Sequence, residues 1–198
     1  MSSATSSHGS AMLKRGFDFT LAAMAMLVLS PVLLCVALVV KWTSAGPVLY
    51  WSERVGRNNR IFVMPKFRTM LVDTPAVATH LLVDPNRFLT RVGPFLRRTS
   101  LDELPQFWSI IKGDMSFVGP RPALFNQYDL VALRTEAGVD KLLPGLTGWA
   151  QINGRDELPI PQKVQLDVQY MNTQSFWMDL KIMFLTALKV IRSEGVSH

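Results

Sequence analysis

The longest hydrophobic stretch of the chain extends from Phe19 to Val40 and contains 22 residues without a charged side chain. At about 1.5 Å per residue, a straight helix of this length would just cross a hydrocarbon core of about 30 Å. Ser30 and Pro31 interrupt the stretch near its middle. A proline there removes a backbone hydrogen bond and disfavours helix at the residue before it. Each half, at roughly eleven residues, would reach only about halfway into a bilayer.

Basic residues border this stretch on both sides, at Lys14, Arg15 and Lys41, so little charge asymmetry is available to orient a crossing helix. A helix-break-helix over residues 14–42 that enters and leaves by one face of the membrane would keep both basic ends in one compartment. The residues alone leave both alternatives open. The small polar residues that come first, MSSATSSHGS, predict a disordered leader over residues 1–13.

Residues 47–70 predict a β-hairpin, because aromatic and β-branched runs flank the turn sequence GRNN. The alternation of side chains in the second strand places Lys66 and Arg68 on one face. Two interpretations stay open for this pair of cations. They grip an anion together, or they are the solubilising charges of an exposed edge strand.

Helical patterns dominate the rest of the chain. A short helix is expected around Arg87 to Leu96, and DELPQFWSIIKG predicts a helix that ends near Gly113. The last predicted helix, SFWMDLKIMFLTALKVIRSEG, has one broad apolar face, which suits either packing on a core or lying at a membrane surface. The expected fold is therefore α+β and mostly helical. It combines the hydrophobic segment near the N-terminus, a small β-hairpin and amphipathic helices within residues 43–198.

The positive charge of the chain is concentrated in its middle. Residues 41–121 hold twelve of the 21 Lys and Arg residues and six of the 15 Asp and Glu residues, which accounts for the whole net charge of +6. Such an excess favours an anionic partner: nucleic acid, phospholipid headgroups or a phosphorylated small molecule. The single cysteine and the three histidines lack metal-ligand spacing, which argues against a zinc site.

Within this basic segment, RRTSLDELPQFW sets Asp102 and Glu103 directly after two arginines. One interpretation is a capping box, since Ser100 and Glu103 have the S-x-x-E spacing and would each close a free backbone N–H. Pro105 argues against a helix that starts at Ser100, because its ring would crowd a carbonyl of the first turn. At least one of the two carboxylates would then be available for something other than its own backbone.

A stiff loop presents Arg121 between Pro120 and Pro122. Proline fixes its own φ and keeps the residue before it extended. The loop is either a simple turn or a support for a guanidinium that forms a bidentate contact with an oxyanion.

Four segments follow the hydrophobic stretch in order: KFRTM, TSLDELPQFW, KGDMSFVGPRP and PGLTGWAQINGR. Together they closely resemble the bacterial sugar transferase family, the monotopic polyprenyl-phosphate phosphoglycosyl transferases. The likeness extends from about Lys14 to Val196, and it depends on four collinear motifs rather than on any one of them. Pro65 and Gln169 stand where members often have tyrosine, which leaves the sugar specificity open.

The resemblance implies an activity and a location. Members move a sugar phosphate from a UDP-sugar donor to undecaprenyl phosphate, a polyprenyl phosphate, with Mg²⁺ and with release of UMP. They do so on the cytoplasmic face of the bacterial inner membrane, where their hydrophobic segment is a re-entrant helix hairpin, here broken at Ser30 and Pro31. Membrane lipids are then partners as well, nucleic acid is not expected, and formation of a homo-oligomer stays open.

The resemblance also implies roles for single residues. Asp102 and Glu103 match the catalytic Asp-Glu dyad, in which the aspartate is the nucleophile and forms a covalent phospho-sugar intermediate; both carboxylates are the expected magnesium ligands. Four basic residues match positions linked to the substrate phosphates: Lys66, Arg68, Arg97 and Arg121. Weaker matches, to contacts with the nucleotide or the sugar, are Arg155, Asp167 and Asp179.

Two other functions remain as alternatives. A non-catalytic, membrane-tethered module would bind anions through the basic segment, but Asp102 and Glu103 would repel a phosphate backbone that brings no metal. An aspartyl-phosphate hydrolase would release inorganic phosphate, whereas a transferase releases UMP. A carboxylate that attacks a diphosphate needs cations and a metal to mask the negative charge, which gives a reason for placing an acidic pair among arginines.

Overall fold

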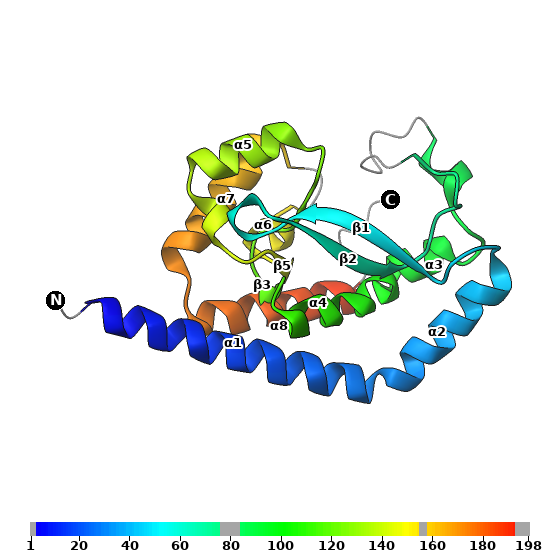
Figure 1. The fold of residues 1–198 in the computed structure, drawn as a ribbon, viewed down its shortest axis with the longest axis horizontal. Helices are drawn as coiled ribbons and strands as arrows, with labels where there is room; N and C mark the ends of the chain where they lie inside the picture. The colour runs from blue at the N-terminus through cyan, green and yellow to red at the C-terminus, as the bar shows by residue number, and fades with distance from the viewer. Residues whose placement is uncertain (1–2, 76–83, 155–157, 193–198) are drawn as a thin grey trace.

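Helices form most of the chain and the strands are short, as Figure 1 shows for the computed structural model, which describes residues 3–75, 84–154 and 158–192. Two small sheets accompany the helices, so the predicted α+β, mostly helical fold is confirmed. The α-helices are α1 (Ser3–Val28), α2 (Ser30–Thr43), α3 (Gly93–Arg98), α4 (Phe107–Lys112), α5 (Tyr128–Glu136), α6 (Trp149–Ile152), α7 (Ile160–Thr173) and α8 (Phe176–Arg192). The 3₁₀ helices are η1 (Arg57–Asn59), η3 (Pro85–Phe88), η4 (Leu101–Gln106) and η5 (Val139–Lys141). The strands are β1 (Leu49–Val55), β2 (Ile61–Phe67), β3 (Ser116–Val118), β4 (Ala123–Leu124) and β5 (Gly145–Thr147).

The N-terminal hydrophobic segment is a bent pair of helices, α1 and α2. Among the described residues no helix is long and apolar enough to span a membrane alone; Met12–Val28 and Ser30–Thr43 reach that length and composition only together, with a bend of 62° between them. Pro31 lacks the N–H that would bond the carbonyl of Leu27, and the Ser30 hydroxyl donates to that carbonyl instead, at 2.8 Å. The chain therefore bends where the sequence predicts a break.

Helix α1 begins at Ser3. The disordered leader that the sequence predicts over residues 1–13 stays a prediction. Serine and alanine cost little in a helix, and extending a helix that the apolar segment has nucleated is far easier than starting one.

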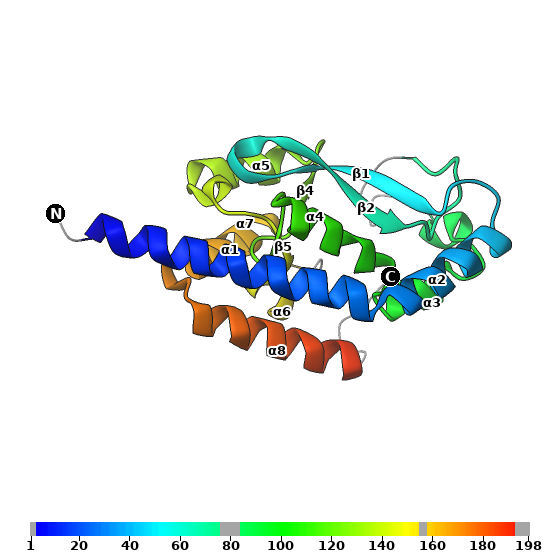
Figure 2. The same ribbon diagram turned by 60° about the horizontal axis from the view of Figure 1, so that its bottom comes forward.

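The basic residues that begin the hydrophobic segment fasten α1 to the rest of the chain. Arg15 donates to the carbonyls of Ile110 and Ile111, at 2.5 and 2.6 Å, and so satisfies two carbonyls at the C-terminal end of α4. Lys14 forms an ion pair with the buried Asp179 of α8. Figure 2 shows α1 and α8 lying side by side, in agreement with these contacts.

The two sheets lie above this helical layer (Figure 1). Strands β1 and β2 form the predicted antiparallel hairpin, and β4 pairs with the other edge of β1. Strands β3 and β5 form a separate parallel pair. The main core joins the hairpin, α1, α4, β3, α7 and α8 through nine buried residues: Ala22, Met64, Phe107, Ile110, Met115, Phe117, Val118, Tyr170 and Ile182.

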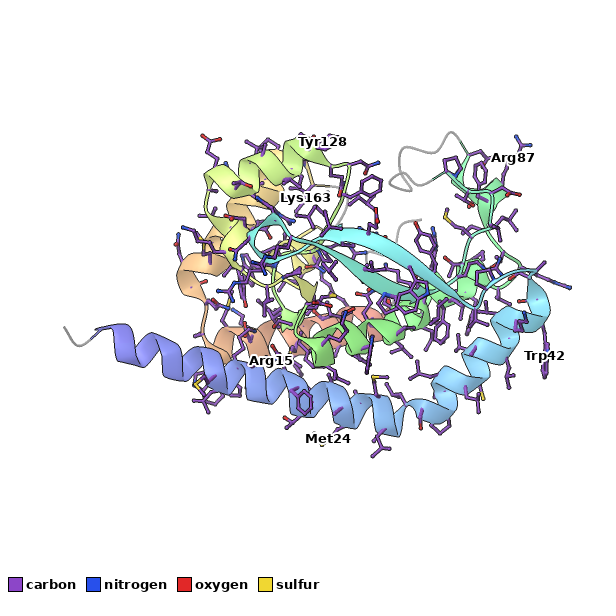
Figure 3. All side chains as sticks on the ribbon, in the orientation of Figure 1. Arg15, Met24, Trp42, Arg87, Tyr128 and Lys163 are labelled. Atoms are coloured by element: carbon purple, nitrogen blue, oxygen red, sulfur yellow. The ribbon has the colours of Figure 1, made fainter. Side chains whose placement is uncertain are left out.

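A large set of apolar side chains on α1, α2 and α8 is left exposed. On α8 the buried positions include Asp179 and Ile182, whereas Phe176, Trp177 and Phe184 are exposed, so this helix packs on the core along only part of its surface. In Figure 3, Met24 and Trp42 point away from the remainder of the chain, and Arg15 points toward it. An apolar surface of this extent indicates an interaction site rather than a face left in water. Its further members on α1 and α2 include Met12, Leu13, Phe19, Leu27, Val28, Val32, Leu34, Leu38 and Val39.

Candidate active site

The acidic pair lies on a 3₁₀ helix, η4, that precedes α4. Ser100 adopts a left-handed conformation with φ of 56° and its side chain makes no capping hydrogen bond. The backbone N–H of Glu103 donates to the Ser100 carbonyl at 3.2 Å, but the Glu103 carboxylate binds elsewhere. The capping-box interpretation is therefore wrong. Pro105 lies inside η4, and the α-helix begins only at Phe107, because a proline in the second turn would leave an α-helical carbonyl without its donor.

Two cations from distant parts of the chain hold the Glu103 carboxylate. Lys66 of β2 lies 2.8 Å from Glu103 Oε1, and Nη2 of Arg121 lies 3.2 Å from the same oxygen. Burial by itself would raise the pKa of Glu103. Lys66 and Arg121 outweigh burial and hold the pKa well below its usual range. Glu103 is therefore ionised at neutral pH and shared between two positive side chains.

Asp102, next to Glu103 in the chain, differs from it in burial and in hydrogen bonding. It is 7% exposed, and no described residue forms a hydrogen bond or ion pair with its carboxylate. Its pKa is raised to about 6, and burial is the largest cause of this shift. The positive charges of Lys66, Arg97 and Arg121 act in the opposite direction, whereas the Glu103 carboxylate also raises the pKa. Asp102 is thus a carboxylate within the field of three cations, with its oxygens not committed to its own backbone.

Arg97 completes the basic surroundings of the pair. Its Nε donates to the hydroxyl of Thr69 at 3.0 Å, which orients the side chain from α3. Burial lowers the pKa of Arg97, and the negative charge of Asp102 partly offsets that effect. Arg97, Lys66 and Arg121 are therefore three predicted phosphate-binding residues that the fold gathers around the acidic pair.

Arg68 is not brought to the acidic pair. Its guanidinium donates to the carbonyls of Ala45 and Ser44, at 2.6 and 3.0 Å, and to the Ser44 hydroxyl at 2.8 Å, just after the end of α2. Strand β2 ends at Phe67, so the alternation that would align Arg68 with Lys66 does not continue to it. Arg68 instead fastens the segment that follows α2 to the end of the β1–β2 hairpin.

The weaker matches lie away from the pair or outside the described residues. Asp179 binds Lys14 and accepts from the Tyr170 hydroxyl at 2.7 Å, so it joins α1, α7 and α8. Asp167 is 2% exposed and binds Arg134 of α5, with Oδ2 2.7 Å from Nη2. Arg155 lies outside the described residues.

Arg134 is the residue that sequence reasoning missed. Besides binding Asp167, its Nη1 donates to the backbone carbonyl of Arg121 at 2.8 Å. Arg134 and Asp167 lie 33 residues apart, and no local pattern connects them. A single arginine on a short helix gives no signal for such a contact.

The donor set is compatible with a hard cation that also binds phosphate. The described residues contain no cluster of three or more His, Cys, Asp or Glu side chains that could hold a metal by themselves. Asp102 and Glu103 are neighbouring residues that carry carboxylates, and Mg²⁺ is commonly bound by one or two carboxylates together with substrate phosphates and water. A metal that arrives with a phosphorylated substrate fits this pair better than one held permanently.

A model of the family described as "Bacterial sugar transferase" matches residues 9–193. The chain belongs to the bacterial sugar transferase family. This confirms the family resemblance of the four motifs.

Individual relatives of this sugar transferase are similar over most of its length. It is 44% identical over 186 residues to the UDP-glucose:undecaprenyl-phosphate glucose-1-phosphate transferase of Escherichia coli (strain K12), a match that covers 90% of the chain and 40% of that relative. It is 43% identical over 186 residues to the "Uncharacterized sugar transferase EpsL" of Bacillus subtilis (strain 168), covering 94% of the chain and 91% of that relative. It is 37% identical over 204 residues to the undecaprenyl-phosphate galactose phosphotransferase of Salmonella typhimurium, covering 92% of the chain and 41% of that relative. The sugar transferase therefore spans about two fifths of the length of two of these relatives.

Proposed function

We propose that the chain transfers a sugar 1-phosphate from a UDP-sugar to a polyprenyl phosphate, with release of UMP, as the first membrane step of glycoconjugate assembly. The observation that carries the proposal is the state of Asp102, a buried carboxylate within the field of Lys66, Arg97 and Arg121 that is not tied to its own backbone. The names of the relatives, which include both glucose and galactose transferases, support the reaction class and leave the sugar open.

In the first half of the reaction, the Asp102 carboxylate attacks the phosphorus atom that bears the sugar. A P–O bond forms to Asp102 while the bond to the UMP oxygen breaks, and UMP leaves with that electron pair. The diphosphate is negatively charged, so the attack needs positive charge close by. Lys66, Arg97 and Arg121 supply it.

In the second half, an oxygen of the polyprenyl phosphate attacks the same phosphorus. The bond to Asp102 breaks, its carboxylate is restored, and the lipid leaves as a polyprenyl diphosphate sugar. The two substrates thus react one after the other at one site, which predicts ping-pong kinetics.

Mg²⁺ is the proposed cofactor, with Asp102 and Glu103 as the residues that would hold it. When bound, it would neutralise phosphate charge and favour departure of UMP. Glu103 is held by two cations when no substrate is present, so binding of a metal-diphosphate would replace one set of partners by another.

The exposed apolar side chains of α1, α2 and α8 support a monotopic attachment, in which the bent pair enters and leaves one face of the bacterial inner membrane. The active site would then lie at the level of the lipid headgroups on the cytoplasmic face, where a soluble UDP-sugar and a lipid-bound phosphate can meet.

Release of UMP tests the proposed function. Purified protein in detergent or nanodiscs is given Mg²⁺, polyprenyl phosphate and each member of a panel of UDP-sugars. We expect UMP and a polyprenyl diphosphate sugar in equal amounts with at least one donor. Inorganic phosphate as the product would indicate the hydrolase alternative, and binding of UDP-sugars without any turnover would indicate the anion-binding module.

The pKa of Asp102 predicts the acid side of the pH profile. The raised pKa of about 6 belongs to the free protein, and kcat/KM reports the ionisation of free enzyme and substrate. Because the attacking form is the carboxylate, we expect kcat/KM for the UDP-sugar to be level above about pH 7 and to fall about tenfold per pH unit below about pH 6. A profile that stays level down to pH 4 would contradict an essential carboxylate with this pKa.

A further inference from the structure

The loop that carries Arg121 is fixed through its carbonyl groups. Pro120 and Pro122 have no N–H, so at these two positions the backbone can be held only through the hydrogen bonds that the carbonyls accept and through packing. Gly119 allows close approach here, since a Cβ at this position would lie 2.2 Å from the carbonyl oxygen of Leu143. The position of the Arg121 side chain therefore depends on the donors that reach this segment.

Three separate donors reach three consecutive carbonyls. The carbonyls of residues 120–122 accept, in order, from the N–H of Gly145 at 2.9 Å, from Nη1 of Arg134 at 2.8 Å and from Nη1 of Arg54 at 3.2 Å. The donors come from β5, α5 and β1. The middle carbonyl, that of Arg121 itself, is held by a guanidinium.

The guanidinium of Arg134 is itself fixed by Asp167. Asp167 Oδ2 accepts from Nε at 2.9 Å and from Nη2 at 2.7 Å, and the side chains of Arg134 and Asp167 are only 11% and 2% exposed. A planar guanidinium bound along one edge by a carboxylate has a fixed direction for its remaining nitrogen. In this arrangement Nη1 is aimed at the Arg121 carbonyl.

We propose that Arg134, oriented by Asp167, is a positioning residue of the active site that holds the Arg121 loop so that the Arg121 guanidinium meets Glu103 and the substrate phosphate. The inference deepens the proposed function and rests on it, because Arg121 needs a substrate to act on. It replaces the weak assignment of Asp167 to nucleotide or sugar contact by a different role. Asp167 acts on the reaction through Arg134 and then through Arg121, and it touches no substrate.

The test removes the donor without leaving a buried charge. Arg134→Met combined with Asp167→Leu replaces the ion pair by apolar side chains of similar size, a change that is often neutral for stability. If this apolar double variant does not fold, the second variant is Arg134→Lys. Lysine retains a positive charge opposite Asp167 but cannot donate to Asp167 and to the Arg121 carbonyl from one planar guanidinium. Arg60→Gln, an exposed arginine at the hairpin turn, is the matched control for loss of positive charge.

Two measurements are made on each variant. Hydrogen exchange of the peptide that spans residues 119–127 reports the order of the loop without any turnover, and kcat/KM for UMP release reports its effect on the reaction. We expect the apolar pair to exchange at least about tenfold faster in this peptide and to lose about 10–100-fold in kcat/KM. Arg60→Gln changes neither.

The Arg121→Gln background decides whether Arg134 acts through Arg121. There the apolar pair should lower kcat/KM by less than about twofold, because the group that it positions is already absent. An equal loss in both backgrounds, or unchanged exchange of the peptide, would overturn the inference. If the wild-type protein releases no UMP with any donor, the proposed function fails, while the exchange measurement still confirms or overturns the hold of Arg134 on the loop.

Discussion

Replacing Asp102 by asparagine should abolish turnover without weakening the fold. The amide keeps the size of the side chain but does not attack phosphorus, so we expect UMP release to fall by roughly a thousandfold or more. The folded protein raises the pKa of Asp102 to about 6, chiefly through burial. A carboxyl group with a raised pKa stabilises the folded state only while it is protonated, and that contribution is lost as the pH rises from about 4 through 6.

At pH 7–8 the ionised Asp102 therefore costs stability, about 3 kcal/mol for a shift of this size. Asp102→Asn removes that cost, and thermal unfolding in detergent should show an equal or higher midpoint. Asp73→Asn, at an exposed position, is the control and should change neither turnover nor unfolding. Retained turnover in Asp102→Asn would refute the assigned nucleophile, and a large loss of stability would mean that Asp102 is chiefly structural.

Glu103→Gln should lower the stability of the folded protein, in contrast to Asp102→Asn, and should also impair the reaction. Lys66 and Arg121 share the Glu103 carboxylate, and a neutral amide leaves both with a weaker partner. Because these side chains are partly exposed, we expect a loss of about 1–3 kcal/mol in the free energy of unfolding. Since the pKa of Glu103 is held well below its usual range, this stabilisation is present at neutral pH and is lost only as the pH falls through that lowered pKa.

The same variant should shift the pH profile. The negative charge of Glu103 raises the pKa of Asp102, so its removal should move the acid limb of kcat/KM below pH 6 in whatever activity remains. Glu53→Gln makes the same chemical change at an exposed position and should stay within about 0.5 kcal/mol of the wild type. An acid limb that moves to higher pH in Glu103→Gln would contradict the electrostatic account of the pair.

Local patterns predicted those parts of the structure that local chemistry decides. The turn GRNN between two apolar runs gave the β1–β2 hairpin, and proline after serine gave the bend between α1 and α2. The capping box failed because Glu103 gains more from Lys66 and Arg121 than from a backbone N–H of its own turn. The pairing of Lys66 with Arg68 failed for a similar reason, since the alternation of a strand applies only up to Phe67.

The relation between Asp167 and the candidate site was beyond prediction from the sequence. It depends on the packing of α5 against α7, which brings Arg134 to Asp167 and to the backbone of a third segment. The motifs predict which basic residues bind the substrate phosphates. They did not indicate which carboxylates hold the arginines in place, because those contacts are made between elements distant in the chain.

The most direct test of the account is the mass of the peptide that contains Asp102 after the protein is incubated with Mg²⁺ and a UDP-sugar that it accepts, in the absence of lipid acceptor. The account predicts one UMP released per active site and a mass increase of one sugar phosphate on that peptide, which disappears when polyprenyl phosphate is added. An unmodified peptide in promptly quenched samples of protein that turns over with both substrates would contradict a covalent intermediate on Asp102.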